Sequence, residues 1–177
     1  MKKKTLALVL ALTLLVAGVV GGTLAWLTDR TAEVKNTFTV GDINIDLTET
    51  TADYKMVPGN TIAKDPTVTV KANSEACWLF VKVTESTDLK DFITYAIAEG
   101  WTALPGVDGV FYREVPASAA DQTFSVLADD AVTVKSDVTR TMLETAKTDA
   151  PTLTFQAYAI QKDHFATADA AWAEVSK

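Results

Sequence analysis

The stretch at residues 77–83 (CWLFVKV) constrains the fold more than any other part of the sequence. Successive side chains of a β-strand point to opposite faces, so this segment has two faces to compare. One face carries Cys77, Leu79, Val81 and Val83, and the other carries Trp78, Phe80 and Lys82. Because both faces are largely apolar, we expect a central strand that is covered from both sides.

Further short apolar runs, separated by turn residues, predict the rest of an antiparallel fold. Pro58-Gly59-Asn60 is a strong turn signal. The dipeptides Pro105-Gly106 and Asp108-Gly109 mark the loop of a hairpin. The expected strand regions are 37–49, 67–71, 77–83, 93–97, 110–112, 124–126, 132–134 and 152–161. About eight short strands in a chain of this length predict an all-β sandwich over residues 37–177.

The first strand region, residues 37–49 (TFTVGDINIDLTE), changes phase at Gly41. Phe38 and Val40 alternate before the glycine, and apolar residues at positions 43, 45 and 47 alternate after it. A β-bulge at Gly41 would keep both halves pointed at one core. Two short strands joined by a turn at residues 41–42 explain the pattern equally well, and the sequence leaves both interpretations open.

Short helices are expected to decorate the sandwich. Residues 88–92 can form one helical turn, and Ser136 or Asp137 can cap a helix that ends near Ala146. From residue 165 onward apolar residues recur at three- and four-residue steps, which predicts a C-terminal helix folded back onto the sandwich. The alternative for this last segment is a frayed tail.

The N-terminus has the pattern of an export signal. Three lysines at positions 2–4 precede an uncharged run that ends at Thr28, and its apolar part stops at Gly21-Gly22. Thr23-Leu24-Ala25 is a small-x-small site, which predicts cleavage between Ala25 and Trp26 and a signal peptide at residues 1–25. An uncleaved membrane anchor is the alternative, because 18 or more apolar residues can span a bilayer. We favour cleavage, since the glycines and the small-residue site end the apolar run.

Cleavage there changes the charge balance of the chain. It removes three lysines and no acid, so the formal charge falls from −7 for 177 residues to −10 for the remaining 152. An acidic surface repels nucleic acid and anionic lipid, so neither is an expected partner, and the membrane is expected to be met only through the uncleaved signal segment. The single Cys77 excludes an intrachain disulfide and predicts a buried thiol. We therefore expect a secreted protein.

The sequence carries no pattern typical of catalysis, a cofactor or a metal. No serine is framed by glycines, and the eight glycines are too scattered for a phosphate loop. Cys77 and His164 are far apart in sequence, and one histidine cannot form the two-histidine zinc motif of metalloproteases. Three tryptophans, Trp78, Trp101 and Trp172, lie in strand or helix patterns that favour core packing. We expect a non-enzymatic protein.

Several segments resemble the TasA/camelysin family of secreted bacterial proteins. The most specific is GGTLAWLTD (21–29) followed by NTFTVGDINIDLTE (36–49). The others are VPGN (57–60), DPTVTVKANSEACWLFVKV (65–83), TFQAYAIQ (154–161) and the AW-containing tail. The resemblance implies a signal peptide removed by a SipW-like signal peptidase and a jelly-roll β-sandwich.

The resemblance also implies assembly into fibres of the extracellular matrix or cell surface. In such fibres the extended arm of one subunit, here residues 26–36, completes the sheet of the next in a head-to-tail homopolymer. The donor residues implied for this chain are Trp26, Leu27, Thr28, Asp29, Val34 and Lys35. A minor accessory protein of the fibre is a further implied partner.

Two other functions stay open at this point. The family includes camelysin, described as a casein-cleaving metalloprotease, although the HExxH pattern is absent here. A monomeric surface adhesin or sugar-binding module is the other alternative, with Trp101 as the residue to test. The fibre subunit is the preferred hypothesis because it gives the polar arm, which has no evident partner in its own chain, a physical role.

Overall fold

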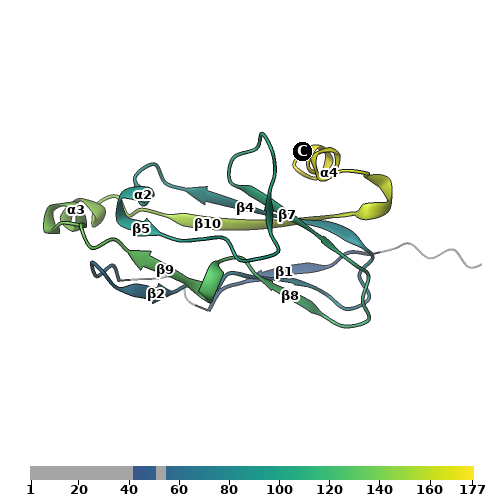
Figure 1. Cartoon of the computed structure of the whole chain (residues 1–177), viewed down its shortest axis with the longest axis horizontal. Coiled ribbons are helices and arrows are strands. Elements are labelled where there is room, and N and C mark those ends of the chain that lie inside the picture. The colour runs from purple at the N-terminus through teal and green to yellow at the C-terminus, as the bar shows by residue number, and fades with distance from the viewer. Residues whose placement is uncertain (1–41, 51–54) are drawn as a thin grey trace, which may run out of the picture. The chain divides into compact units, whose positions relative to one another are not determined.

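The computed structural model describes residues 42–50 and 55–177 (Figure 1). The chain divides into two compact units, 1–39 and 40–177, and all described residues belong to the second. The described strands are β1 (Ile45–Thr48), β2 (Thr61–Ala63), β3 (Thr67–Val70), β4 (Cys77–Glu85), β5 (Ile93–Thr94), β6 (Thr102–Ala103), β7 (Val110–Val115), β8 (Gln122–Ser125), β9 (Ala131–Val134) and β10 (Leu153–Gln161). The α-helices are α2 (Leu89–Phe92), α3 (Arg140–Ala146) and α4 (Ala168–Val175), and 3₁₀ turns η1 (Ala128–Asp130) and η2 (Lys162–His164) complete the set.

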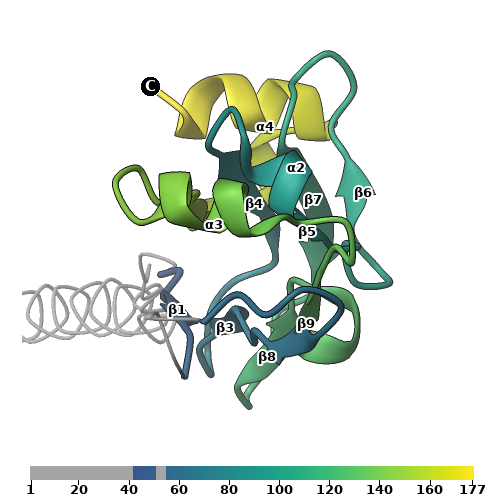
Figure 2. The same cartoon turned by 90° about the vertical axis from the view of Figure 1, so that its left-hand side faces the viewer.

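The strands form two facing layers (Figures 1 and 2). One layer is the sheet β10-β4-β7-β6, and the other combines the sheets β1-β3-β8 and β2-β9-β5. Only three residues separate β2 from β3, and they form a kink. A hydrogen bond joins this kink to the segment between β8 and β9, because the Lys64 N–H donates to the Asp130 carbonyl at 2.7 Å. The two smaller sheets therefore continue one another within a single layer.

The chain passes repeatedly between these layers. It crosses from β3 to β4, back to β5, over to β6, back again after β7, and finally from β9 to β10. Every pairing between strands is antiparallel. The predicted all-β sandwich is thus confirmed, and the alternation between layers gives it a jelly-roll-like order.

Strand β4 is central and buried on both faces, as its sequence predicted. It pairs with β10 along one side and with β7 along the other. Leu79 and Val81 face the core between the layers, together with Val68 and Val70 of β3. Phe80 lies on the outer face in a second apolar cluster, which includes residues of α4. Helix α4 lies over this layer (Figure 2).

The C-terminal helix is an ordered part of the fold, so the frayed-tail alternative is wrong. The Thr167 hydroxyl caps α4 by accepting the Ala170 N–H at 3.3 Å. Ala171 is fully buried, and the Trp172 ring lies 5.3 Å from the Phe80 ring, centroid to centroid. Helix α4 therefore closes the outer face of β4 and β10.

Helices α2 and α3 close one end of the sandwich with a third apolar cluster. Its buried members come from α2, β5, β9, α3, the residue before η1 and the turn before α3. The predicted cap of α3 is wrong: the hydroxyl of Thr139, and not Ser136 or Asp137, accepts the Met142 N–H at 3.3 Å. The helix begins later than expected because Thr139 still has an extended backbone, with φ −86° and ψ 162°, and Val138 is buried in the segment before it.

The first strand region is only partly described. Gly41 lies outside the described residues, so the choice between a bulge and a turn remains a prediction. Ile43 and Ile45 pack against the core as expected. Leu47 was expected to face the core too, yet 36% of its surface is exposed. It lies in β1 at the edge of its layer, where no second neighbouring strand is described.

Candidate functional site

Among the residues that the structure describes, strand β10 has an open edge. Within the described chain it pairs with β4 alone and forms the border of its layer. The Lys162 N–H donates to the Ala76 carbonyl and the Ser86 N–H to the Thr152 carbonyl, both at 2.9 Å, so even-numbered residues bond toward β4. Backbone groups alternate in direction along a strand. The odd-numbered residues therefore present their N–H and C=O groups to the open side, and these are Leu153, Phe155, Ala157, Ala159 and Gln161.

The side chains beside the open edge are apolar and belong to the core between the layers. The side chains of Leu153, Phe155, Ala157 and Ala159 all pack against the core between the layers, and each remains partly exposed. Strand β1 runs close to β10 in the other layer and carries the exposed Leu47. An unpaired edge beside partly exposed apolar side chains is a surface suited to adding a further strand.

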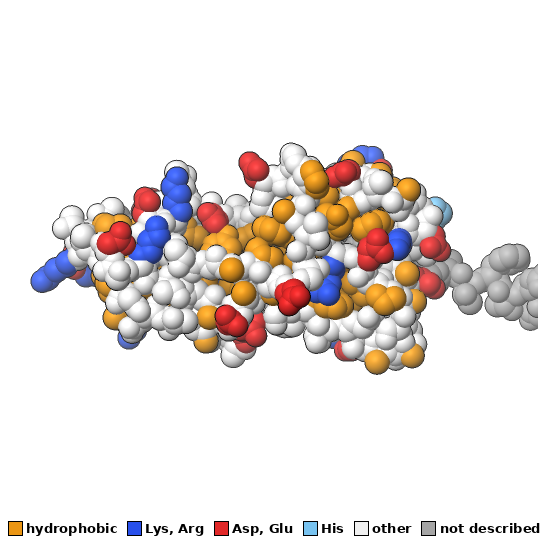
Figure 3. Space-filling view, viewed as in Figure 1, with side chains coloured by type: hydrophobic (Ala, Val, Ile, Leu, Met, Phe, Trp, Pro, Cys, Tyr) orange, Lys and Arg blue, Asp and Glu red, His pale blue; other side chains and the backbone are white. Residues whose placement is uncertain are grey.

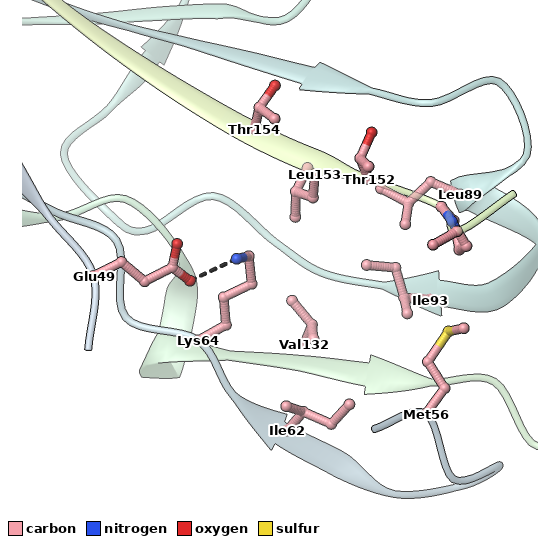
Figure 4. A pocket seen from close by; sticks show the side chains of 12 residues that line it. Glu49, Met56, Ile62, Lys64, Leu89, Ile93, Val132, Thr152, Leu153 and Thr154 are labelled. Atoms are coloured by element: carbon pink, nitrogen blue, oxygen red, sulfur yellow. Dashed lines mark hydrogen bonds and ion pairs between the residues drawn. The ribbon is translucent and has the colours of Figure 1, made fainter. Parts of the chain in front are cut away.

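A cleft of about 480 Å³ lies where β10 begins (Figure 4). Its walls come from both layers, so it opens into the space between them. The apolar lining residues labelled in Figure 4 are Met56, Ile62, Leu89, Ile93, Val132 and Leu153. On the β2 side, the described chain gives that strand a partner only in β9. The cleft is therefore bordered by two strand edges with an apolar floor between them.

An ion pair between a buried lysine and a more exposed glutamate forms the polar wall of this cleft. Lys64 is 7% exposed, and its Nζ lies 2.5 Å from Oε1 of Glu49 (Figure 4). The same Nζ lies 5.3 Å from the centre of the Phe155 ring, an arrangement that favours a cation over an aromatic face. Because leaving a buried charge without its partner is costly, this pair holds the end of β1 against the kink between β2 and β3.

A second contact holds the end of β1 at the same kink. The Asp65 carboxylate accepts the backbone N–H of Thr50 at 3.0 Å and also the hydroxyl of Thr50. These hydrogen bonds, the side-chain bond foremost, hold the pKa of Asp65 below its ordinary value. The end of β1 is thus held by two polar contacts, of which the pair of Glu49 and Lys64 lines the cleft.

The residues singled out from the sequence as functional lie outside the described residues. These are the cleavage pair Ala25 and Trp26 and the arm residues Trp26, Leu27, Thr28, Asp29, Val34 and Lys35. The structure describes instead an edge that could receive such an arm, which the sequence did not identify. The alternation of TFQAYAIQ predicted a strand, but nothing in it says which side of that strand lacks a neighbour.

The lone thiol and the lone imidazole of the chain face different surroundings. Cys77 is completely buried, and burial raises the pKa of its thiol to about 11, so the thiol is neutral at pH 7. His164 is exposed in η2. The predicted burial of Cys77 is confirmed.

The three tryptophans named as core residues pack as predicted. Trp78 and Trp172 belong to the cluster beneath α4. Trp101 is half-buried against the main core, and its indole N–H donates to the Ser125 carbonyl at 2.8 Å. Its ring is therefore held in place by the neighbouring layer.

Two features are absent from the described ranges, 42–50 and 55–177. Within those ranges no group of three or more histidine, cysteine or acidic side chains is placed to hold a metal ion. No helix there is both long and apolar enough to cross a membrane.

Comparisons of this chain with protein-family models, with curated proteins and with solved structures found no match. The fold and the site thus define the protein only as an antiparallel β-sandwich with an open edge.

Proposed function

We propose that this protein is a secreted structural subunit of extracellular-matrix or cell-surface fibres and not an enzyme. The arm at residues 26–36 of one copy would add as a strand to the open edge of β10 in the next copy. The single observation that carries the proposal is that edge: the backbone of five residues of β10 points away from β4, beside apolar side chains that remain partly exposed.

The dimensions of the arm suit this edge. A strand rises about 3.3 Å per residue, so the nine residues of β10 extend over roughly 30 Å and the eleven residues of the arm over roughly 36 Å. Five outward residues offer up to ten backbone groups to an incoming strand. An arm of this length can therefore pair with the whole edge.

The apolar surface at the edge supplies a second reason for strand addition. Alternate side chains of an added strand point toward the core, where Ala157 and Ala159 are small and Leu47 is exposed. Trp26 and Val34 share one face of an extended arm and could cover this surface together, whereas Leu27 would point to the opposite face. Burial of apolar area contributes about 25 cal/mol per Å², so this contact would add to the backbone hydrogen bonds.

The geometry of the contact gives a fibre and not a closed dimer. The arm and the edge are different surfaces of one chain, so each copy can donate to one neighbour and accept from another. Before the predicted cleavage at Ala25 the arm is joined to the signal segment, and its release by a SipW-like signal peptidase would allow assembly to begin. No cofactor is needed, and the partners are further copies of the chain, with a minor accessory protein as an additional one.

Electron microscopy of the processed protein tests this proposal. Protein beginning at Trp26 is expected to form filaments, whereas protein lacking residues 26–36 is expected to stay monomeric at the same concentration. A synthetic peptide of residues 26–36 should slow assembly of the intact protein, and a peptide of scrambled sequence serves as its control. Filaments of normal abundance from the truncated protein would show that the arm is not the donor.

A further inference from the structure

The end of the sandwich that carries α3 has a groove distinct from the cleft beside β10. Its volume is about 490 Å³, and its floor includes Val57, Leu143 and Ala146. Val57 is 48% exposed, which makes it one of only two strongly exposed large hydrophobic residues in the described chain. An apolar floor open to solvent indicates a contact surface.

The rim of this groove is basic in an acidic protein. It carries Lys55, Arg140 and Lys147, and Figure 3 shows lysine and arginine side chains gathered at the end where α3 lies. Lys147 is paired with Glu144 at 2.8 Å. In the described chain neither Lys55 nor Arg140 has an acidic partner within 4 Å. Two cations beside an exposed apolar floor are thus available to an acidic partner.

The opposite end of the sandwich carries the complementary charge. The loop before β4 lies at this end, because the nine residues of β4 separate it from α2 at the other end. In this loop the Glu75 N–H donates to the carbonyl of Asp42, in the segment before β1, at 3.1 Å. Turn η2 lies at the same end, because Lys162 bonds to Ala76. Glu75 and Asp163 are exposed there, and no ion pair is formed by either within the described ranges.

If the proposed donor arm is correct, the short segment between the arm and β1 brings the acidic end of one copy close to the basic end of the next. An arm that runs antiparallel to β10 would end at the cleft where β10 begins, and Met56 lines both that cleft and the groove. Five residues, 37–41, then lead to Asp42 of the donating copy, and the six steps from residue 36 to Asp42 span at most about 22 Å. The acidic end of the donor must therefore lie close to the basic groove of the acceptor.

We propose that the groove bounded by Lys55, Arg140 and Val57 is the axial docking surface for the acidic end of the next copy of this chain. The interaction joins Glu75 and Asp163 of one copy to the basic rim of its neighbour. This inference rests on the proposed donor-arm assembly and adds a contact between folded domains to it. Opposite charges at the two ends set the direction of stacking and disfavour contacts between like ends.

Charge reversal tests the docking surface. The double variant Lys55→Glu/Arg140→Glu is expected to raise the critical concentration for filament formation about tenfold at low salt, because two attractive pairs become repulsive. Its control is Lys82→Glu/Lys177→Glu, which changes the net charge equally at exposed sites outside the groove and should assemble like the unmodified protein. Sedimentation gives the critical concentration, and circular dichroism verifies that each variant is folded.

A charge exchange makes the test specific to the two ends. Adding Glu75→Lys and Asp163→Lys to the groove variant should restore assembly, since attraction returns with the signs exchanged. If the groove variant assembles as readily as the control, or if the exchange restores nothing, the docking surface is wrong. Failure of the unmodified protein to form arm-dependent filaments would instead overturn the proposed function, so the two failures are distinguishable.

Discussion

At the scale of residues, the contacts at the mouth of the β10 cleft explain why the end of β1 is fixed there. Lys64 is buried although it is charged, because Glu49 neutralises it and the Phe155 ring faces its ammonium group. Asp65 and Thr50 add hydrogen bonds beside this pair. Together these contacts fix the end of β1, and Lys64 and Glu49 also line the cleft.

The contact of Asp65 predicts a pH dependence of stability. Its pKa in the folded protein is held below the ordinary value of 3.8 by the hydrogen bonds from Thr50. A depressed pKa means that the contribution is fully present above pH 3.8 and is lost as the pH falls through the lower, folded value. Asp65→Asn should therefore lower the Tm at pH 7, and the difference from the unmodified protein should shrink as the pH falls below 3.8, because the native carboxyl loses its charge as the pH falls through its lower folded pKa.

Thermal melting of both proteins by circular dichroism across this pH range measures the effect. Asp163→Asn is a suitable control, because that carboxylate is exposed and takes part in no ion pair within the described chain. A difference in Tm that does not shrink as the pH falls below 3.8 would contradict the role given to the ionised Asp65.

At the scale of elements, the sequence identified strands better than it identified their neighbours. The two-faced apolar pattern of β4 placed it centrally, and Gly109, predicted in a hairpin turn, has a φ of +72° with no room for a Cβ beside the Val83 carbonyl. Such signals are local. The open side of β10 depends on which strands meet after folding, and that pairing leaves no mark on residues 153–161 themselves. Leu47 was misplaced for the same reason.

A proline in β10 distinguishes its open side from its paired side. The N–H of Ala157 points away from β4, and proline is tolerated in edge strands where the lost N–H faces outward. Ala157→Pro should therefore fold but fail to accept a strand, because a donor at the edge would lose a hydrogen bond and meet the ring. We expect a monomer with native circular dichroism and no filaments.

The matched variant is Tyr158→Pro. Tyr158 lies opposite Phe80 with its backbone directed toward β4, so this change removes a bond within the sheet. It should destabilise the monomer by about 1–3 kcal/mol, measured by chemical denaturation. If Ala157→Pro forms filaments as abundantly as the unmodified protein, β10 is not the accepting strand.

At the scale of the whole molecule, function is proposed from an unfilled edge and from charges at two ends, and not from a catalytic constellation. Cleavage at Ala25 would leave a strongly acidic chain, in which basic groups near α3 form a local exception. The composition predicted the acidity, but only folding brings Lys55 and Arg140 to one groove. The positions of Lys55 and Arg140 depend on how the chain passes between the two layers, and local sequence patterns do not determine that path.

Backbone hydrogen exchange, read residue by residue in monomers and in filaments, tests the central claim most directly. In the monomer lacking residues 26–36, the amides of Phe155, Ala157 and Ala159 should exchange rapidly, while those of Gln156 and Tyr158 are protected by β4. In filaments of the intact processed protein, the three odd-numbered amides should become protected by at least about tenfold. Equal exchange of these amides in monomers and filaments would contradict strand addition at β10.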